Sequence, residues 1–251
     1  MRKILPIIII ILVGFFLLSK PFKNSIVSNP NTQLAQAIQA GTVGAWSFDE
    51  GSGTTSTDLS GNNITGTLTN GPTWNTGGKY GSAINLDGVD DYVNVPNNIV
   101  LNPSNAVTFM GWVRTNSMAT EQIILSKGSS SPQYYMRIRS NGAVRLYVTL
   151  GGSLITFNSP ISTVMANTWY HLAGVYDGND IKLYVNGVLS GTPVSTTGTM
   201  VDNGASLTIG FQPGLTGFNF NGAIDDVRVY NRALNVTEIT TDMNTPTQTP
   251  P

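Results

Sequence analysis

Short apolar segments separated by clusters of Gly, Asn, Asp and Ser run from Val43 to about Tyr230. Such a succession is typical of antiparallel strands in a β-sandwich or a β-barrel. No helical period is sustained before Ala233. The pattern predicts twelve strands, over residues 43–48, 82–86, 92–95, 107–114, 122–126, 133–139, 144–150, 154–157, 169–176, 181–186, 206–211 and 223–230.

Two of these segments indicate how deeply their strands are buried. In residues 181–186 apolar side chains alternate strictly with Lys182, Tyr184 and Asn186. Strict alternation is typical of a strand with one buried face. In residues 107–114 both sets of alternate positions are apolar. This segment is therefore predicted to be a central strand that is covered on both sides.

The composition supports an all-β fold with one short C-terminal helix. Charged residues make up 11% of the chain, and it contains only three Glu. A helical surface would carry many more Glu and Lys. The predicted helix covers residues 234–243, with Asn235 as its N-cap, because Asn readily accepts a hydrogen bond from the first helical turn.

The net charge of −1 conceals an uneven distribution. Residues 1–40 carry four basic side chains and no acid, so the remainder has 9 basic and 14 acidic side chains, a net of −5. An acidic domain does not suit the phosphates of nucleic acids, and no nucleic-acid partner is expected. The chain has no Cys, which excludes disulfides, thiolate nucleophiles and cysteine zinc sites.

The N-terminal segment has the pattern of an export signal. Arg2 and Lys3 precede an uncharged, mostly apolar run over residues 4–18. This run is shorter than the about 20 residues of a membrane span, which favours cleavage. Small residues suited to cleavage lie far beyond the run, at Ala35, Ala37 and Ala40. The alternative is therefore that the segment is not cleaved and anchors the protein to a membrane.

Either outcome places the domain outside the cytoplasm, secreted or anchored to a membrane through its N-terminal segment only. Residues 1–23 are predicted to be a signal peptide or N-terminal membrane anchor, and residues 24–40 a polar spacer. Residues 41–243 then form the folded domain. Residues 244–251, rich in Thr and Pro, are predicted to be a linker or a disordered end.

Five segments in a fixed order resemble the laminin-G-like, concanavalin A-like jelly-roll family. They are GAWSFDEGSGTTSTDLSGNNITGTL (44–68), YGSAINLDGVDDYVNVP (80–96), VTFMGWVRT (107–115), NTWYHLAGVYDGNDIKLYVNGV (167–188) and FNGAIDDVRVYNRALNVTEI (220–239). The resemblance implies a two-sheet antiparallel jelly-roll sandwich and a role in glycan binding or adhesion. Because the family is functionally broad, the resemblance does not name a ligand.

The residues argue against catalysis. Glycoside hydrolysis needs two carboxylates that face one sugar ring, and no two Glu lie close in the sequence. The adjacent pairs Asp90-Asp91 and Asp225-Asp226 would point to opposite faces of a regular strand. His171, the only histidine, has no accompanying members of a triad or zinc site, and a structural role is favoured. The protein is expected not to be an enzyme.

A calcium ion is the metal that the sequence suits best. Residues 58–63 form an oxygen-rich loop, and Ca²⁺ takes several oxygen ligands. Asp225 is expected to point inward with Val227 and Val229, where a bare carboxylate is costly. The hypothesis is one structural Ca²⁺ held by Asp58, Asn62 and Asp225, with Asp49 or Glu50 as further candidates. The alternative is that Asp58 and Asn62 close a turn and Asp225 accepts backbone N–H groups.

A ligand-binding surface is predicted on the hairpin over residues 133–150. A three-residue turn with a Gly kink would keep apolar side chains opposite apolar ones. The other face of the hairpin would then carry five polar or aromatic side chains, Tyr135, Arg137, Arg139, Arg145 and Tyr147. Aromatic rings and guanidinium groups suit sugars or carboxylated glycans.

An ordinary solvated strand face is the alternative to this ligand-binding surface. The loop aromatics Trp74, Phe218 and Phe220 are a second candidate, or they cover the core. The preferred function is a non-catalytic carbohydrate-binding, lectin-like or adhesion module. The alternative is a structural display domain whose partner is an extracellular protein.

Overall fold

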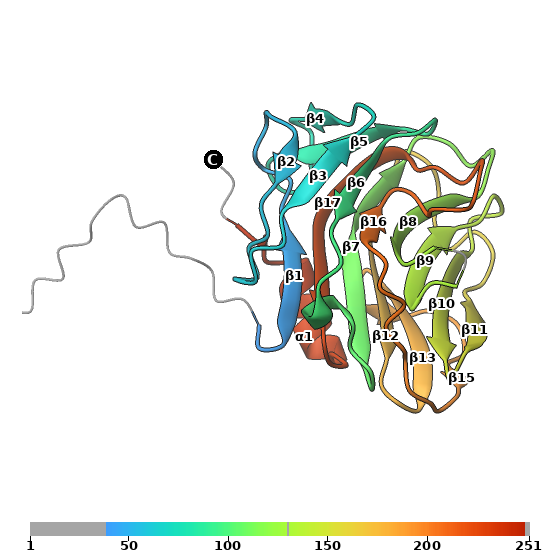
Figure 1. Cartoon of the computed structure of the whole chain (residues 1–251). Coiled ribbons are helices and arrows are strands. Elements are labelled where there is room, and N and C mark those ends of the chain that lie inside the picture. The colour runs from blue at the N-terminus through green and yellow to red at the C-terminus, as the bar shows by residue number, and fades with distance from the viewer. Residues whose placement is uncertain (1–38, 130, 249–251) are drawn as a thin grey trace, which may run out of the picture. The chain divides into compact units, whose positions relative to one another are not determined.

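Two antiparallel β-sheets stack face to face in the computed structural model, which describes residues 39–129 and 131–248 (Figure 1). This architecture confirms the predicted all-β, two-sheet sandwich. The predicted leader (1–23) and most of the spacer (24–38) lie outside the described residues. No helix in the described part of the chain is long and apolar enough to span a bilayer.

The first sheet, sheet A, contains nine strands. Seven lie in the order β14-β13-β12-β7-β17-β5-β4, while β1 pairs with β17 and β15 with β13. Their bounds are β1 (Thr42–Trp46), β4 (Thr73–Asn75), β5 (Ala83–Asp87), β7 (Val107–Thr115), β12 (Tyr170–Tyr176), β13 (Asp180–Val185), β14 (Val188–Leu189), β15 (Val194–Ser195) and β17 (Asn221–Tyr230).

The second sheet, sheet B, contains eight strands in the order β11-β10-β9-β8-β16-β6-β3-β2. Their bounds are β2 (Thr55–Ser56), β3 (Gly66–Thr69), β6 (Tyr92–Val95), β8 (Gln122–Lys127), β9 (Tyr134–Ile138), β10 (Val144–Leu150), β11 (Ser153–Asn158) and β16 (Leu207–Ile209). A short 3-10 helix, η1 (Ile99–Leu101), lies between β6 and β7.

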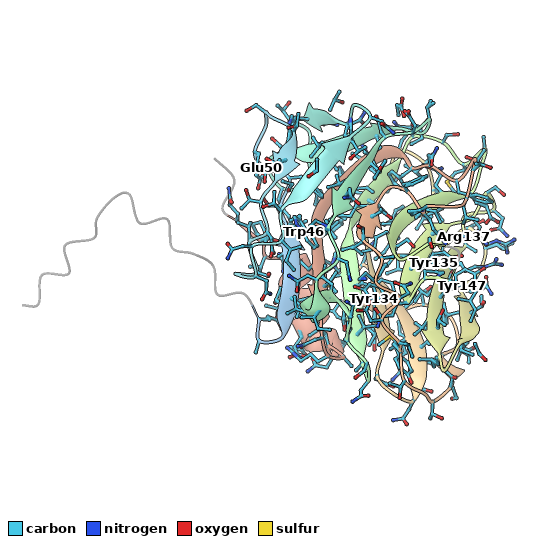
Figure 2. All side chains as sticks on the ribbon, viewed as in Figure 1. Trp46, Glu50, Tyr134, Tyr135, Arg137 and Tyr147 are labelled. Carbon is cyan, nitrogen blue, oxygen red and sulfur yellow. The ribbon has the colours of Figure 1, made fainter. Side chains whose placement is uncertain are left out.

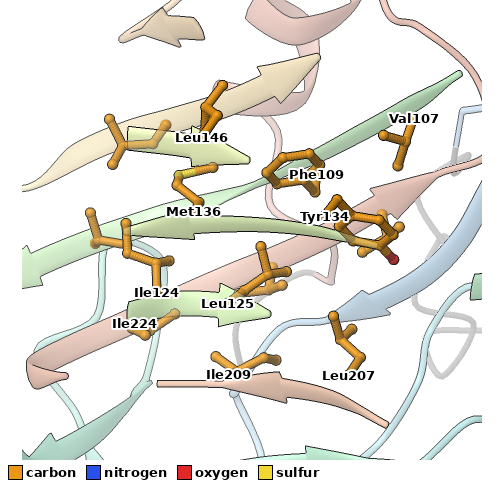
Figure 3. Close-up of a cluster of buried hydrophobic side chains, with 14 of the residues drawn as sticks. Val107, Phe109, Ile124, Leu125, Tyr134, Met136, Leu146, Leu207, Ile209 and Ile224 are labelled. Carbon is orange, nitrogen blue, oxygen red and sulfur yellow. The ribbon is translucent and has the colours of Figure 1, made fainter. Parts of the chain in front are cut away.

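The main core fills the space between the sheets (Figure 3). Phe109 of β7 stacks on Tyr134 of β9, with ring centroids 5.1 Å apart. Ile181 and Leu183 of β13 are fully buried, which confirms the predicted one-sided strand. Burial of this apolar surface is the main stabilising term of the sandwich, since each fully buried large side chain contributes about 1.5–3 kcal/mol.

A second, smaller core lies on the outer face of sheet A, beneath α1 (Val236–Met243). Ile239 of α1 packs there with Met110 of β7 and Tyr230 of β17. Strand β7 is therefore covered on both sides, as its sequence predicts. Asn235 caps the helix and forms a reciprocal capping box with Glu238, which confirms the predicted cap. The helix begins two residues later than predicted.

Five short strands were not predicted from the sequence: β2, β3, β4, β14 and β15. Each has two to four residues, and most of their side chains are exposed or half-buried. A segment this short cannot show an alternating pattern, and these strands form because longer neighbours offer hydrogen-bonding partners. The twelve predicted strands are all present, with ends shifted by up to two residues.

Residues just outside the predicted boundaries at 41 and 243 contact the folded domain. Gln39 donates a hydrogen bond to Asp242 at 2.6 Å. At the other end Thr247 is 8% exposed, and its N–H donates to Asp226 at 2.9 Å. The sequence indicates a linker or a disordered end from residue 244. Thr245 and Thr247 nevertheless form hydrogen bonds with buried charged groups of β17.

Candidate functional site

The predicted hairpin is formed by β9 and β10 with the register expected from the sequence. Met136 lies opposite Leu146 on the core face, and Arg137 lies opposite Arg145 on the outer face of sheet B. The Arg139 N–H donates to the Ala143 carbonyl at 2.8 Å, which leaves three residues in the turn. Gly142 in this turn has a φ of +78°, a conformation that favours glycine. The predicted three-residue turn is confirmed.

The candidate surface consists of Tyr135, Arg137, Arg139, Arg145 and Tyr147, and the hairpin brings all five to one face. Figure 2 shows Tyr135, Arg137 and Tyr147 together on one side of the molecule. The rings of Tyr135 and Tyr147 stack, with centroids 4.2 Å apart. The guanidinium groups of Arg137 and Arg145 lie near the Tyr147 ring, 5.6 Å and 5.7 Å from its centroid.

The Tyr147 hydroxyl is the polar centre of this surface. It accepts hydrogen bonds from Arg145 Nη1 at 3.0 Å and from Arg137 Nη2 at 3.3 Å. Burial would raise the pKa of Tyr147, but hydrogen bonds from Tyr135 and Arg145 lower it overall. Burial raises the pKa of Tyr135, which remains a donor. The two phenols therefore have different roles, one donating and the other accepting.

Glu121 is a member of the surface that the sequence analysis missed. Its carboxylate lies 3.0 Å from Arg137 Nη2 and 3.0 Å from Arg139 Nε. It immediately precedes β8, whose first residue Gln122 pairs with Ile138. Pairing the two segments in the sequence would have placed Glu121 beside Arg139. With one acid against three guanidinium groups, the surface keeps an excess of positive charge.

Only part of this surface can be reached by a ligand. Tyr135, Arg137 and Tyr147 are at most 9% exposed, because the rings cover one another and Phe218 packs over them. Arg139 and Arg145 are half-buried, and Asn158, which accepts a hydrogen bond from Arg145 Nε at 2.6 Å, is exposed. The accessible part is therefore an edge formed by Arg139, Arg145 and Asn158.

The three loop aromatics have different positions. Phe220 is fully buried in the main core, and Trp74 packs partly against it. Trp74 Nε1 donates to the Gly53 carbonyl at 3.0 Å. Phe218 joins the Tyr–Arg cluster, and the Phe218 carbonyl accepts a hydrogen bond from Ile123 at 2.8 Å. Two of the three aromatics therefore cover the core, and Phe218 belongs to the candidate surface.

His171 lies in β12 on the outer face of sheet A, opposite Trp112 of β7. It is 2% exposed, and burial lowers its pKa to about 3, with Arg228 and Lys79 adding to the effect. A neutral, buried imidazole packed at 5.4 Å from the Trp112 ring has the geometry of a structural residue. It offers no accessible base to a substrate.

The position expected for Asp225 is wrong. Asp225 pairs with Trp112, so it lies on the outer face of sheet A, while Val227 and Val229 face the core. A register shift between Asp225 and Arg228 reverses the alternation of side chains, so that Asp225 and the two valines face opposite sides of the sheet. Asp226, within this irregularity, has a φ of +51°. The carboxylate is fully buried as expected, but beneath a loop on the sheet and not inside the sandwich.

The same register shift means that Asp225 and Asp226 do not alternate as neighbours on a regular strand would. Burial raises the pKa of Tyr80, and both carboxylates add to this effect. Asp226 accepts hydrogen bonds from Thr247 and lies 3.5 Å from Arg228 Nη2. Both carboxylates are buried, so neither can reach a sugar ring from this position.

Asp58 has the environment of a turn-closing residue. Its carboxylate accepts hydrogen bonds from the N–H groups of Ala45, Ser60 and Ile64, at 3.0, 2.9 and 3.0 Å, and from the Ser60 hydroxyl. Asn62 donates to the Val43 carbonyl at 3.2 Å. Within residues 39–129 and 131–248, Asp225 shares no hydrogen-bonding partner with either residue. A shared calcium ion at these three residues stays a prediction, and their contacts match the alternative of turn closure.

One acidic group in the described ranges brings three possible metal ligands within 4.8 Å: Asp87, Asp90 and Asp91. Asp87 and Asp90 are exposed. Asp91 accepts a hydrogen bond from the Asp87 N–H at 3.1 Å, and the Asp87 carboxylate accepts one from Val89 at 2.7 Å. These bonds are those of an acidic turn, which needs no ion.

Known proteins with the same fold are found by comparison of sequence and structure. The family model described as the concanavalin A-like lectin/glucanases superfamily matches residues 87–240. No curated protein sequence matches the chain. Among solved structures, domain 4 of the extracellular arabinanase AbnA from Geobacillus stearothermophilus, in complex with arabinotriose, is similar with a TM-score of 0.65 and 24% identity. The match covers 82% of this chain and 100% of that domain.

Two toxin binding domains are also similar. The binding domain of Paraclostridial Mosquitocidal Protein 1 has a TM-score of 0.69 at 19% identity. The binding domain of botulinum neurotoxin DC, in complex with rat synaptotagmin II, has 0.63 at 18%. Each match covers 81% of this chain, which spans about half the length of these two domains (52% and 51%). At these identities the comparisons establish a shared fold.

Proposed function

Because the chain belongs to the concanavalin A-like lectin/glucanase superfamily, we propose that it is a non-catalytic carbohydrate-binding module that works outside the cytoplasm. Its ligand is a glycan that carries carboxylate groups. The observation that carries this proposal is the edge formed by Arg139, Arg145 and Asn158 in an otherwise acidic domain.

The edge has the donors that such a glycan requires. A guanidinium group can donate two parallel hydrogen bonds to a carboxylate, and it binds more strongly when its orientation is fixed. Tyr147 and Asn158 hold Arg145 by its Nη1 and Nε atoms, at 3.0 Å and 2.6 Å. Glu121 holds Arg139 through Nε, which leaves its terminal nitrogens for a ligand.

The absence of catalysis is also part of the proposal. Glycoside hydrolysis requires two carboxylates on either side of one bond. Glu121, the acid at the candidate surface, is engaged by two guanidinium groups. Asp49, Asp225 and Asp226 are buried on the other sheet. The location outside the cytoplasm is supported by the charged and apolar pattern of residues 1–18.

A protein partner is the alternative ligand. A similar toxin binding domain was solved in complex with rat synaptotagmin II, which motivates this alternative. A positively charged edge also fits an acidic peptide. The same arginines would then bind carboxylates of a protein and not of a sugar.

The test is a glycan array probed with the full chain, containing neutral and carboxylated glycans. We expect binding to carboxylated glycans that weakens as salt increases. The double variant Arg139→Gln/Arg145→Gln should lose about tenfold or more in affinity, since each charged hydrogen bond contributes about 1.5–3 kcal/mol.

The matched control is Arg114→Gln. Arg114 lies on β7 of sheet A, with its guanidinium group 5.3 Å from the Trp169 ring. This variant should bind like the wild type. If the double variant binds glycans as tightly as the wild type, the surface around Arg139 and Arg145 is not the binding site. A silent array with folded protein would leave the protein-binding alternative.

A further inference from the structure

Lys127 is a fully buried lysine that the proposed glycan surface does not use. It is the last residue of β8 and pairs with Tyr134 of β9 and Leu207 of β16. Both partners belong to the main core, so the Lys127 side chain lies on the core face of sheet B. Lysine is almost never fully buried unless its amine is paired, because removing an ammonium group from water is costly.

The hydrogen-bonding partners of the Lys127 amine are neutral oxygens. Nζ donates to Asn97 Oδ1 at 2.9 Å and to the Ala205 carbonyl. The carboxylate of Asp202 lies at the longer distance of 4.0 Å from Nζ. Burial lowers the pKa of Lys127, and the charge of Asp202 opposes only part of this effect. The neutral amine, which is a nucleophile, is therefore more favoured here than in an exposed lysine.

Asn97, between β6 and η1, presents the carbon that such a nucleophile would attack. The side-chain carbon Cγ is bonded directly to Oδ1, so the hydrogen bond from Lys127 Nζ holds the amine beside it. Asn102 Nδ2 donates a second hydrogen bond to Oδ1 at 3.1 Å, and it is oriented by a bond to the Asn98 carbonyl at 2.9 Å. A donor placed on this oxygen would stabilise the negative charge that develops there during attack.

We propose that Lys127 and Asn97 join in an intramolecular isopeptide bond after the domain folds. The neutral Nζ attacks Cγ of Asn97, so that the Nζ–Cγ bond forms and the Cγ–Nδ2 bond breaks. Asp202 accepts a proton from Nζ and passes it to Nδ2, which leaves as ammonia. The exchange of one amide for another requires no oxidant or other co-reactant. Asn97 is exposed, so the ammonia can escape into the solvent.

The bond would cross-link two separate parts of sheet B. Asn97 and Lys127 are 30 positions apart, and β16 lies between β6 and β8 in the sheet. The link would therefore fasten the segment after β6 to the end of β8 across β16. A covalent cross-link stabilises a fold mainly by restricting the unfolded chain. For a chain without Cys, this bond would take the place of a disulfide and would resist reducing agents.

Mass spectrometry of the purified full chain tests the proposal. The wild type should be lighter than its sequence requires by the mass of one ammonia molecule. Lys127→Met removes the nucleophile and Asn97→Ala removes the attacked amide, so both variants should have their full sequence mass. Asp202→Asn removes the group that carries the proton, and it should be recovered mainly without the bond. Loss of the bond should also lower the melting temperature of each variant.

A tryptic digest locates the bond. Trypsin does not cleave after an acylated lysine, so residues 80–114 should be recovered joined to residues 115–137. A linear peptide over residues 80–137 has nearly the same mass, and fragment-ion spectra must therefore place the branch at Lys127. The matched control is Lys182→Met, because Lys182 is ion-paired with Asp177 and Asp180. This variant should lack one ammonia as the wild type does.

A folded wild type with its full sequence mass overturns the proposal. A mass deficit that persists in Lys127→Met also overturns it, because ammonia would then be lost by cyclisation of an Asn with its own backbone. If Lys127→Met or Asn97→Ala does not fold, the wild-type mass and the branched tryptic peptide decide the question. None of these results bears on the glycan surface, because Lys127 lies on the core face of sheet B and the arginines lie on its outer face.

Discussion

Tyr135 and Tyr147 lie directly opposite each other on β9 and β10, with their rings stacked at 23° and centroids 4.2 Å apart. The stack brings the Tyr147 hydroxyl within hydrogen-bonding distance of Arg137 and Arg145. A pair of rings thus supports the guanidinium groups that we propose for ligand binding. The aromatic rings themselves are too buried to stack on a sugar.

Tyr147→Phe tests the role of this hydroxyl. The ring stack should persist, while two hydrogen bonds from guanidinium groups are lost. We expect the free energy of unfolding to fall by about 1–2 kcal/mol, measured by urea denaturation, because Arg137 is buried and Arg145 can turn toward water. Tyr184→Phe on β13 is the control and should change little. A variant as stable as the wild type would show that the hydroxyl does not hold the arginines.

Glu121→Gln should have opposite effects on stability and on binding. Arg137 is buried, and loss of the charge 3.0 Å from its Nη2 should destabilise the fold by about 2 kcal/mol. The surface becomes more positive, so carboxylated glycans should bind more tightly at low salt. Urea denaturation and binding titrations at two salt concentrations measure the two effects. Weaker binding to every glycan would contradict a ligand held by charge.

Removal of the chain end after Asn244 tests whether the C-terminal residues belong to the domain. This truncation removes Thr247, the partner of buried Asp226, and the Thr245 carbonyl, the partner of Arg228. We expect a loss of about 2–4 kcal/mol, because buried charged groups lose hydrogen bonds. Truncation after Gln248 keeps these bonds and should melt like the full chain. Equal melting of both truncations would make residues 245–248 a linker after all.

His171 should contribute to acid unfolding. Burial holds its pKa at about 3 in the folded state, below the ordinary value of 6.5, so the unfolded chain binds the proton first. Its stabilising contribution is present above about pH 6.5 and is lost progressively as the pH falls toward 3. Thermal melts between pH 7 and pH 4 should show a smaller fall for His171→Gln than for the wild type. Parallel curves would mean that another group dominates.

The hairpin surface could be predicted from the sequence because its cause is local. Alternation along residues 133–150 fixes which side chains share a face, and the Gly142 turn fixes the register. The helix cap at Asn235 is local for the same reason. The burial of Tyr135 and Tyr147 was not predictable, because the residue that covers them, Phe218, comes from a loop far along the chain.

The direction of the Asp225 side chain shows the limit of local patterns most clearly. The sequence indicates that Asp225 is buried, but a regular alternation would direct it into the core. One irregularity in β17 reverses its direction. Asp49, which interacts electrostatically with Asp225, follows β1 at the other end of the domain sequence, so no local pattern could bring the two together.

The sequence by itself determined the two-sheet sandwich, the faces of its long strands and the Tyr–Arg set, since each depends on periodicity and turn chemistry. The tertiary structure alone decided which of those side chains remain accessible to solvent. It also decided which carboxylates from distant segments lie near one another. Burial and long-range contact depend on segments far apart in the chain, whose relative positions only the assembled sheets define.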